Sequence, residues 1–144
     1  MREILFRGKR CDNGEWVQGF YVRADHHWHK NGIHKDWIIC GASANGGWFA
    51  LHNKYAVKAE TVGQFTGLTD KNGKKIFEGD VIKIPDDYDE YGHNAGEIYE
   101  VYFFFGGFRL KPKYSKARGY WLEDDETVEV IGNIHDNPEL LEKP

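Results

Sequence analysis

Disulfide-forming residues and chain breakers are scarce in this sequence. It has two cysteines, Cys11 and Cys40, and four prolines among 144 residues. Two cysteines do not make a disulfide framework, and because the chain has no secretory signal we expect reduced thiols. No hydrophobic run approaches the roughly 20 residues that span a bilayer, and the first residues lack the apolar segment of a signal peptide. We therefore expect a cytoplasmic protein that does not contact membranes.

An excess of positive charge is also missing. Lysine and arginine together number 19 and aspartate and glutamate 23, which gives a formal net charge of −4 at pH 7. A chain with this charge does not attract polyanions as a whole. Any contact with nucleic acid therefore requires a local basic patch.

Recognisable catalytic motifs are absent from the sequence. There is no nucleophile elbow, no phosphate-binding loop with its lysine and no His-Glu-x-x-His pair. Neither of the two serines, Ser43 and Ser115, lies beside a predicted base. Adjacent carboxylates, as at residues 124–126, point apart on a loop or strand, whereas acid–base catalysis requires groups that converge on a substrate. The sequence predicts a protein that is not an enzyme and has no cofactor.

Aromatic residues and glycine, in contrast, are abundant. Aromatic side chains make up 15% of the chain, which supplies a core and argues against disorder of the whole chain. Glycine occurs 17 times, and Asn-Gly pairs occur at residues 13–14, 31–32, 45–46 and 72–73. Because Asn and Gly tolerate the positive φ of tight turns, these pairs indicate β-hairpins between the flanking apolar runs.

Short apolar runs separated by turn residues predict a mostly β chain. The expected strands cover residues 4–6, 16–22, 37–40, 48–51, 61–66, 76–77, 81–84, 98–105, 108–111 and 127–131. The pair Gly106-Gly107 is expected to turn the most apolar strand into the next one. Since long crossover helices are missing, the strands should be antiparallel.

Only the tail of the sequence favours a helix. Asn137 can cap a first turn, Pro138 suits its first position, and Leu140 and Leu141 can dock on a sheet. We predict an all-β fold of short antiparallel strands in two packed small barrel- or sandwich-like subdomains, closed by a short C-terminal helix. A composition change places the subdomains at residues 1–66 and 67–144, the second resembling an SH3-like barrel.

Three segments resemble the YopX family, which is named for a prophage-encoded protein and is widespread in phages and prophages. They are Arg2–Gly8, Gln64–Val81 and Val130–Leu141, and their order and spacing match the family over almost the whole chain. The central segment, QFTGLTDKNGKKIFEGDV, is the most specific. The resemblance implies an all-β protein of phage or prophage origin with no established activity, and we expect its location to be the cytoplasm of the host bacterial cell. The resemblance brings no catalytic or ligand residues.

Turn-forming residues dominate the central segment. Gly73 supplies a positive φ after Asn72, Gly79 supplies a sharp corner, and Asp70 and Asp80 can bond backbone amides in these turns. We interpret Asn72, Gly73, Gly79 and Asp80 as structural. The alternative is that the two aspartates and the glutamate at position 78 bind a divalent cation, because such ions prefer oxygen ligands.

Histidines cluster at residues 26–34. On a strand, His27 and His29 would project from one face, and two imidazoles at that spacing can share a metal ion, completed by Cys40 or Asp25. The segment lacks a paired ligand motif, and glycine and asparagine follow at once. Solvated histidines on a loop are therefore the preferred interpretation, with a metal site as the alternative.

A basic stretch follows the most apolar strand. Residues 109–118 hold five cations and no acid. If the strand continues past Leu110, its cations share one face while Phe108 and Leu110 pack on the other. Cations beside exposed aromatics on a β-barrel are typical of single-stranded nucleic-acid binders. The candidate binding residues are Arg109, Lys111, Lys113, Tyr114, Lys116, Arg118 and Trp121. The alternative is a solvated face balanced by the acidic run at 123–126.

The number of aromatic residues also favours an interaction module. Many large rings in so small a body leave apolar area outside, and unpaired sheet edges add further contact surface. We therefore expect a homo-oligomer that acts as a non-enzymatic binding or assembly module, with a phage or host protein as a further partner. Single-stranded nucleic-acid binding is the alternative.

Overall fold

The computed structural model describes residues 2–25, 34–45, 48–85, 96–113, 120–122 and 127–142. The chain divides into two compact units, Met1–Gln64 and Phe65–Pro144. In each unit the strands are paired antiparallel, which confirms the predicted all-β fold. None of the helices in these described ranges is long and apolar enough to cross a membrane.

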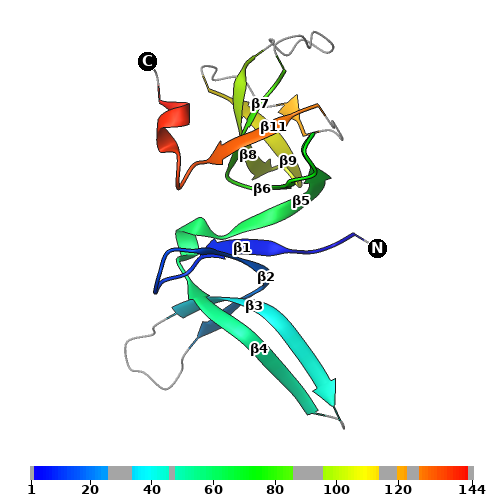
Figure 1. Cartoon of the computed structure of the whole chain (residues 1–144), viewed down its shortest axis with the longest axis vertical. Coiled ribbons are helices and arrows are strands. Elements are labelled where there is room, and N and C mark those ends of the chain that lie inside the picture. Colours follow the sequence, from blue (N-terminus) through cyan, green and yellow to red (C-terminus); the bar gives the residue numbers. More distant parts are fainter. Residues whose placement is uncertain are drawn as a thin grey trace. The chain divides into compact units, whose positions relative to one another are not determined.

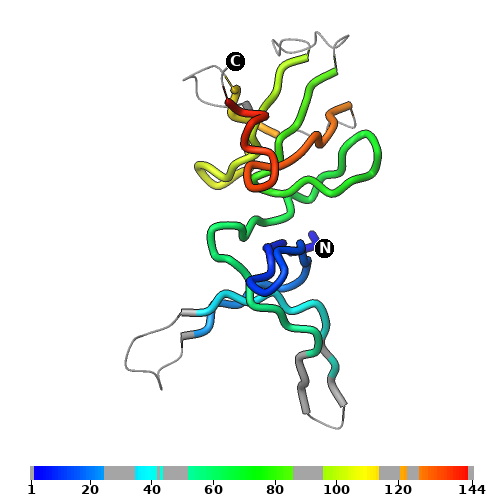
Figure 2. The backbone as a smooth tube through the Cα atoms, turned by 60° about the vertical axis from the view of Figure 1, so that its left-hand side comes forward, coloured from blue at the N-terminus to red at the C-terminus, as the bar shows by residue number. Residues whose placement is uncertain are grey.

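The first unit is a meander of hairpins that β5 completes. Its strands follow the order β4-β3-β2-β1-β5, and in both views β3 and β4 lie side by side as a long hairpin (Figures 1 and 2). Asn45 pairs with Trp48 at the end of this hairpin. The elements are β1 (Phe6–Lys9), β2 (Trp16–Asp25), β3 (His34–Asn45), β4 (Trp48–Val57), the 3-10 helix η1 (Ala59–Thr61) and β5 (Gly63–Thr69).

Close backbone approach shapes the first unit. A Cβ atom at Gly19 would lie 2.2 Å from the carbonyl oxygen of Ile39, so only glycine fits where β2 meets β3. Ile38 is fully buried, and the buried Thr61 accepts a hydrogen bond from the Lys9 amide at 2.8 Å. This hydrogen bond fastens η1 to β1.

The second unit contains a five-stranded sheet of order β10-β9-β8-β7-β11. Its elements are β6 (Lys75–Phe77), β7 (Asp80–Lys83), β8 (Ile98–Phe104), β9 (Gly107–Pro112), β10 (Tyr120–Trp121), β11 (Glu129–Asn133) and the 3-10 helix η2 (Pro138–Leu141). The continuation of β5 pairs with β6, where Phe65 lies opposite Phe77. Within the described residues this sheet is open, and the SH3-like barrel form stays a prediction.

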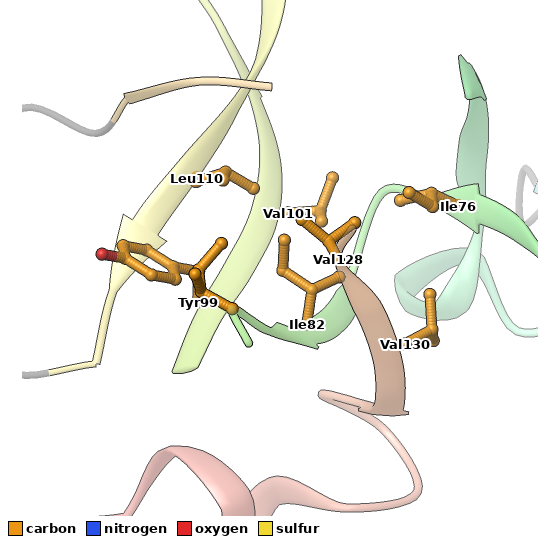
Figure 3. Packing of buried hydrophobic residues seen from close by; sticks show 8 residues of the cluster. Ile76, Ile82, Tyr99, Val101, Leu110, Val128 and Val130 are labelled. Carbon is orange, nitrogen blue, oxygen red and sulfur yellow. The ribbon is translucent and has the colours of Figure 1, made fainter. Parts of the chain in front are cut away.

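Buried hydrophobic residues from this sheet and from β6 form the core of the second unit. Figure 3 shows the side chains from β6, β7, β8, β9 and β11 converging on one another. Tyr99 is a fully buried member of the cluster, and its hydroxyl donates a hydrogen bond of 2.5 Å to Glu97 Oε2. The other members of the cluster are Ile76, Ile82, Ile84, Val101, Leu110, Val128 and Val130.

The position of the β8–β9 turn differs from the sequence-based expectation. The β8–β9 turn consists of Phe105 and Gly106, whereas Gly106 and Gly107 were expected to form it. Buried Val101 pairs with buried Leu110, and this register places Gly107 in β9, opposite Phe104. The short C-terminal helix predicted from the tail is confirmed as the four-residue 3-10 helix η2.

The expected cap of the C-terminal helix is also different. Asn137 makes no capping hydrogen bond, and its Oδ1 instead accepts one from the Asn133 amide at 3.4 Å. A Cβ at Gly132 would lie 2.8 Å from Leu140 Cδ1, so Leu140 packs directly on the backbone of β11. Tertiary packing on β8 and β11 therefore holds η2 in place.

Candidate functional site

The tip of the β8–β9 hairpin carries the main exposed apolar surface of the second unit. Phe104 pairs with Gly107, which leaves Phe105 and Gly106 as a two-residue turn. Their φ angles are 48° and 77°, and positive values at both central positions are what a type I′ turn requires. Phe105 is therefore held at the apex of the hairpin in a left-handed conformation.

Aromatic rings surround this apex. Phe103, Phe104 and Phe105 are 49%, 44% and 77% exposed, and Trp121 on the neighbouring β10 is 52% exposed. The rings of Phe104 and Phe105 meet edge to face at 4.4 Å between centroids, and those of Phe103 and Phe108 do so at 5.2 Å. We refer to Phe103, Phe104, Phe105 and Trp121 as the tip cluster.

The predicted basic face lies next to the tip cluster. Phe108, Leu110 and Pro112 are buried, so Arg109 and Lys111 alternate with them on the opposite face of β9. Lys113 follows directly after the strand.

Arg109 and Lys111 both make contacts within the protein. The Arg109 guanidinium lies 3.9 Å from the centre of the Trp121 ring. Lys111 Nζ lies 3.6 Å from Glu100 Oε2 on the neighbouring strand. An exposed ion pair of this kind contributes little to stability, and added salt weakens it further.

A row of three side chains crosses the sheet beside the tip. Tyr102 and Trp121 lie on either side of Arg109 in the strand register. The Trp121 ring also covers Gly107, where a Cβ would lie 2.3 Å from a ring carbon. The absence of a side chain at position 107 is thus what allows Trp121 to lie flat near the turn.

Several candidates from the sequence lie outside the described residues. These are His27 and His29 of the proposed metal site, and Tyr114, Lys116 and Arg118 of the proposed nucleic-acid site. In the described part of the chain, no group of three or more His, Cys, Asp or Glu side chains is placed to hold a metal ion.

Asp70 connects the turn of the central segment to a distant strand. The side chain is 4% exposed. Its Oδ1 accepts hydrogen bonds from the amides of Asn72 and Lys74, both at 2.9 Å, and its Oδ2 accepts one from Val130 at 3.0 Å. Burial alone would raise the pKa of Asp70, but these three amides and the Lys74 charge outweigh it and lower that pKa below its ordinary value.

The other residues of the central segment lie in or beside tight turns. Gly73 and Gly79 have φ angles of 78° and 84°. Gly73 donates its amide to the Asp70 carbonyl at 2.9 Å, which closes the turn that contains Asn72. The buried Asp80 accepts a hydrogen bond from the Phe77 amide at 2.8 Å, across the Glu78-Gly79 corner. The two aspartates therefore bind backbone amides at these turns.

Sequence reasoning missed a serine–histidine pair. Ser43 Oγ lies 2.6 Å from His52 Nε2 across the β3–β4 hairpin, although Ser43 was expected to have no base beside it. The residues are nine positions apart, so only the strand register brings them together. Both side chains are exposed, and water competes for such a surface hydrogen bond, whereas nucleophilic catalysis uses an oriented and shielded pair.

Phe105 and Tyr102 are further surface residues that the sequence did not single out. The Gly-Gly pair that follows Phe105 suggested a different turn, and Tyr102 belonged to a run of apolar residues with no visible sidedness. The pairing register of β8 with β9, which the sequence does not give, is what places both residues on the surface.

The family model described as YopX protein matches residues 5–142. A Bacillus subtilis (strain 168) protein, the SPbeta prophage-derived uncharacterized protein YopX, is 35% identical over 75 residues, which cover 49% of this chain and 52% of that protein. The match thus spans about half the length of this curated relative.

A solved structure supports the fold over the full length. The crystal structure of protein EF1440 from Enterococcus faecalis aligns with a TM-score of 0.60 and 24% identity, covering 99% of this chain and 100% of that one. At this identity the likeness concerns the fold alone. The family match over most of the chain has a direct consequence: this protein belongs to the YopX family.

Proposed function

We propose that this protein is a non-enzymatic binding or assembly module that associates with itself. The observation that carries the proposal is the tip cluster, in which four large aromatic side chains are each close to half exposed or more. Exposed apolar clusters of this kind mark interaction sites on soluble proteins, and aromatic residues are enriched at the centres of such interfaces.

The name of the Bacillus subtilis relative supports a phage or prophage origin for this chain. The Bacillus subtilis protein is named as prophage-derived. We place this chain in the same setting, as a phage- or prophage-encoded protein in the bacterial cytoplasm that can also bind a phage or host protein. Its net charge of −4 does not favour a polyanionic partner.

Size-exclusion chromatography with light scattering tests self-association. The expected result is a mass that rises toward that of a dimer as the concentration increases from low micromolar to several hundred micromolar. A mass equal to one chain over this whole range would contradict the proposal.

Single-stranded nucleic-acid binding is the second candidate. It is favoured by the row of Tyr102, Arg109 and Trp121, in which a cation and two rings share one face of the sheet. Stacking of bases on aromatic rings beside cations is the usual way of binding single strands. Against it, Arg109 already contacts Trp121 and Lys111 contacts Glu100.

The second candidate has a direct test. Fluorescence polarisation with labelled single-stranded DNA and RNA at low salt should show binding that the triple substitution of Arg109, Lys111 and Lys113 by alanine abolishes. An unchanged polarisation signal for the original protein would remove this candidate.

A further inference from the structure

The apex of the β8–β9 hairpin holds an unfavourable residue for its backbone conformation. Phe105 has a φ of 48°, and this left-handed region is costly for residues with a Cβ, apart from Asn and Asp. Asn or Asp followed by Gly is the usual sequence for such a turn. At residues 72–73, where the chain has Asn-Gly, Gly73 has a positive φ of 78° and Asn72 does not, so that turn differs from the one at Phe105 and Gly106.

This strain brings no gain in packing within the core. Phe105 is 77% exposed, the highest value among the exposed large apolar residues of the described chain. Its ring contacts Phe104, which is itself nearly half exposed. A bulky residue held in a strained turn and directed into solvent indicates a role outside the folded monomer.

The chemistry of the tip fits another copy of the same tip. Residues 101–108, which include the three phenylalanines of the tip cluster, contain no charge, so these three residues offer no ion pair to a charged partner. Phe104 and Phe105 are arranged edge to face at an interplanar angle of 76°. Such a pair presents both a ring face and a ring edge, and a two-fold related copy can match each with its opposite.

From these observations we infer that the tip cluster is the contact between two copies of this chain, related by two-fold symmetry, with Phe105 as its anchor. This inference rests on the proposed self-association and adds its location. Phe103 lies on the Phe108 face of the hairpin. Phe104 and Trp121 lie on the Arg109 face, so the contact must include both faces of the tip. Each aromatic side chain can bury about 150–250 Å², so the four rings, roughly half exposed, together cover on the order of 400 Å² per copy. That is about half of the usual interface of roughly 800 Å² per partner, and the dimer is therefore weak and concentration-dependent.

Replacing Phe105 by asparagine, which this turn prefers, separates the effect on folding stability from the effect on association. Phe105→Asn should raise the thermal midpoint of unfolding by about 3 °C, because the strain is relieved. It should also weaken association at least tenfold in analytical ultracentrifugation. Phe105→Tyr keeps the ring and should associate like the original protein.

Phe20→Thr is the matched control in the first unit. Phe20 is exposed like Phe105 but lies on β2, far from the tip in sequence. Its replacement should leave the dissociation constant of the dimer unchanged. If the original protein dimerises and Phe105→Asn dimerises equally well, the inference is wrong while the proposed function stands. If the original protein stays monomeric, both fail.

Discussion

At the scale of single residues, the Asp70 side chain links the central segment to a distant strand. It joins its own turn, through Asn72 and Lys74, to Val130 sixty positions away in β11. The backbone amide of Lys71 adds a second link, to the Val128 carbonyl at 3.0 Å. One carboxylate therefore fixes a local turn and its place beside the sheet at the same time.

Removal of the Asp70 carboxylate should be costly. Asp70→Ala leaves three amides without their acceptor, one of them on a buried residue, and should lower the free energy of unfolding by about 3 kcal/mol at neutral pH. Urea denaturation measures this cost. Glu60→Ala, which removes an exposed carboxylate, should change stability by less than about 0.5 kcal/mol. Equal costs for the two variants would show that the amide contacts are unimportant.

The contribution of Asp70 should also depend on pH. Its pKa in the folded protein is lowered, so the ionised form is favoured by folding. The stabilisation is complete above the unfolded value of about 3.9 and is lost as the pH falls through the lower folded pKa. The difference between the original protein and Asp70→Ala should therefore shrink below about pH 4. A constant difference would contradict this mechanism.

At the scale of elements, glycine decides how closely β2 and β3 approach. At Gly19 a Cβ would overlap the backbone of Ile39, which cannot move without breaking the strand pairing. Gly41 lies in the same sheet, on β3, but a Cβ there would meet only His52 atoms at 3.8–3.9 Å, an ordinary contact. The two glycines form a matched pair for mutation.

Alanine substitution should separate these two positions. Gly19→Ala should lower the free energy of unfolding by about 2 kcal/mol or more, because the strands must shift apart. Gly41→Ala should change it by less than about 0.5 kcal/mol, since alanine restricts the unfolded chain without a clash. Thermal unfolding followed by circular dichroism compares the two. A larger cost at Gly41 would contradict the strand approach described for Gly19.

Comparison of the predicted turns with the observed ones shows which turns local sequence can predict. The turn at residues 72–73 and the corner at Gly79 each require a positive φ at a glycine, so the residue type alone indicates both turns. The β8–β9 turn was misplaced by one residue because Gly106-Gly107 is locally the better turn. The pairing of Val101 with Leu110 in the core outweighed that local preference.

At the scale of the whole molecule, charge separates the two functions proposed for the second unit. The chain carries a net charge of −4, while the tip cluster has no charge and the adjacent face has Arg109, Lys111 and Lys113. An aromatic contact between two copies releases few bound counterions, so its affinity depends little on salt. Binding of a nucleic acid releases counterions for each phosphate that a cation neutralises.

Salt dependence should therefore distinguish the two activities. The dissociation constant of the dimer should change by less than about threefold over a tenfold increase in salt, because only the weak repulsion between chains is screened. Binding of a single strand by three cations should weaken about a hundredfold over the same range. Sedimentation and fluorescence polarisation at several salt concentrations measure these values. A steep salt dependence of dimerisation would contradict an aromatic contact.

The sequence by itself determined what depends on neighbouring residues. Alternation along residues 108–112 indicated a strand with an apolar and a basic face, and the Asn-Gly pairs and scarce helical patterns indicated an antiparallel all-β chain. The tertiary structure alone decided strand register, because register depends on core packing between distant segments. It therefore placed Phe105 at the apex, Trp121 over Gly107, Ser43 beside His52 and Asp70 beside Val130.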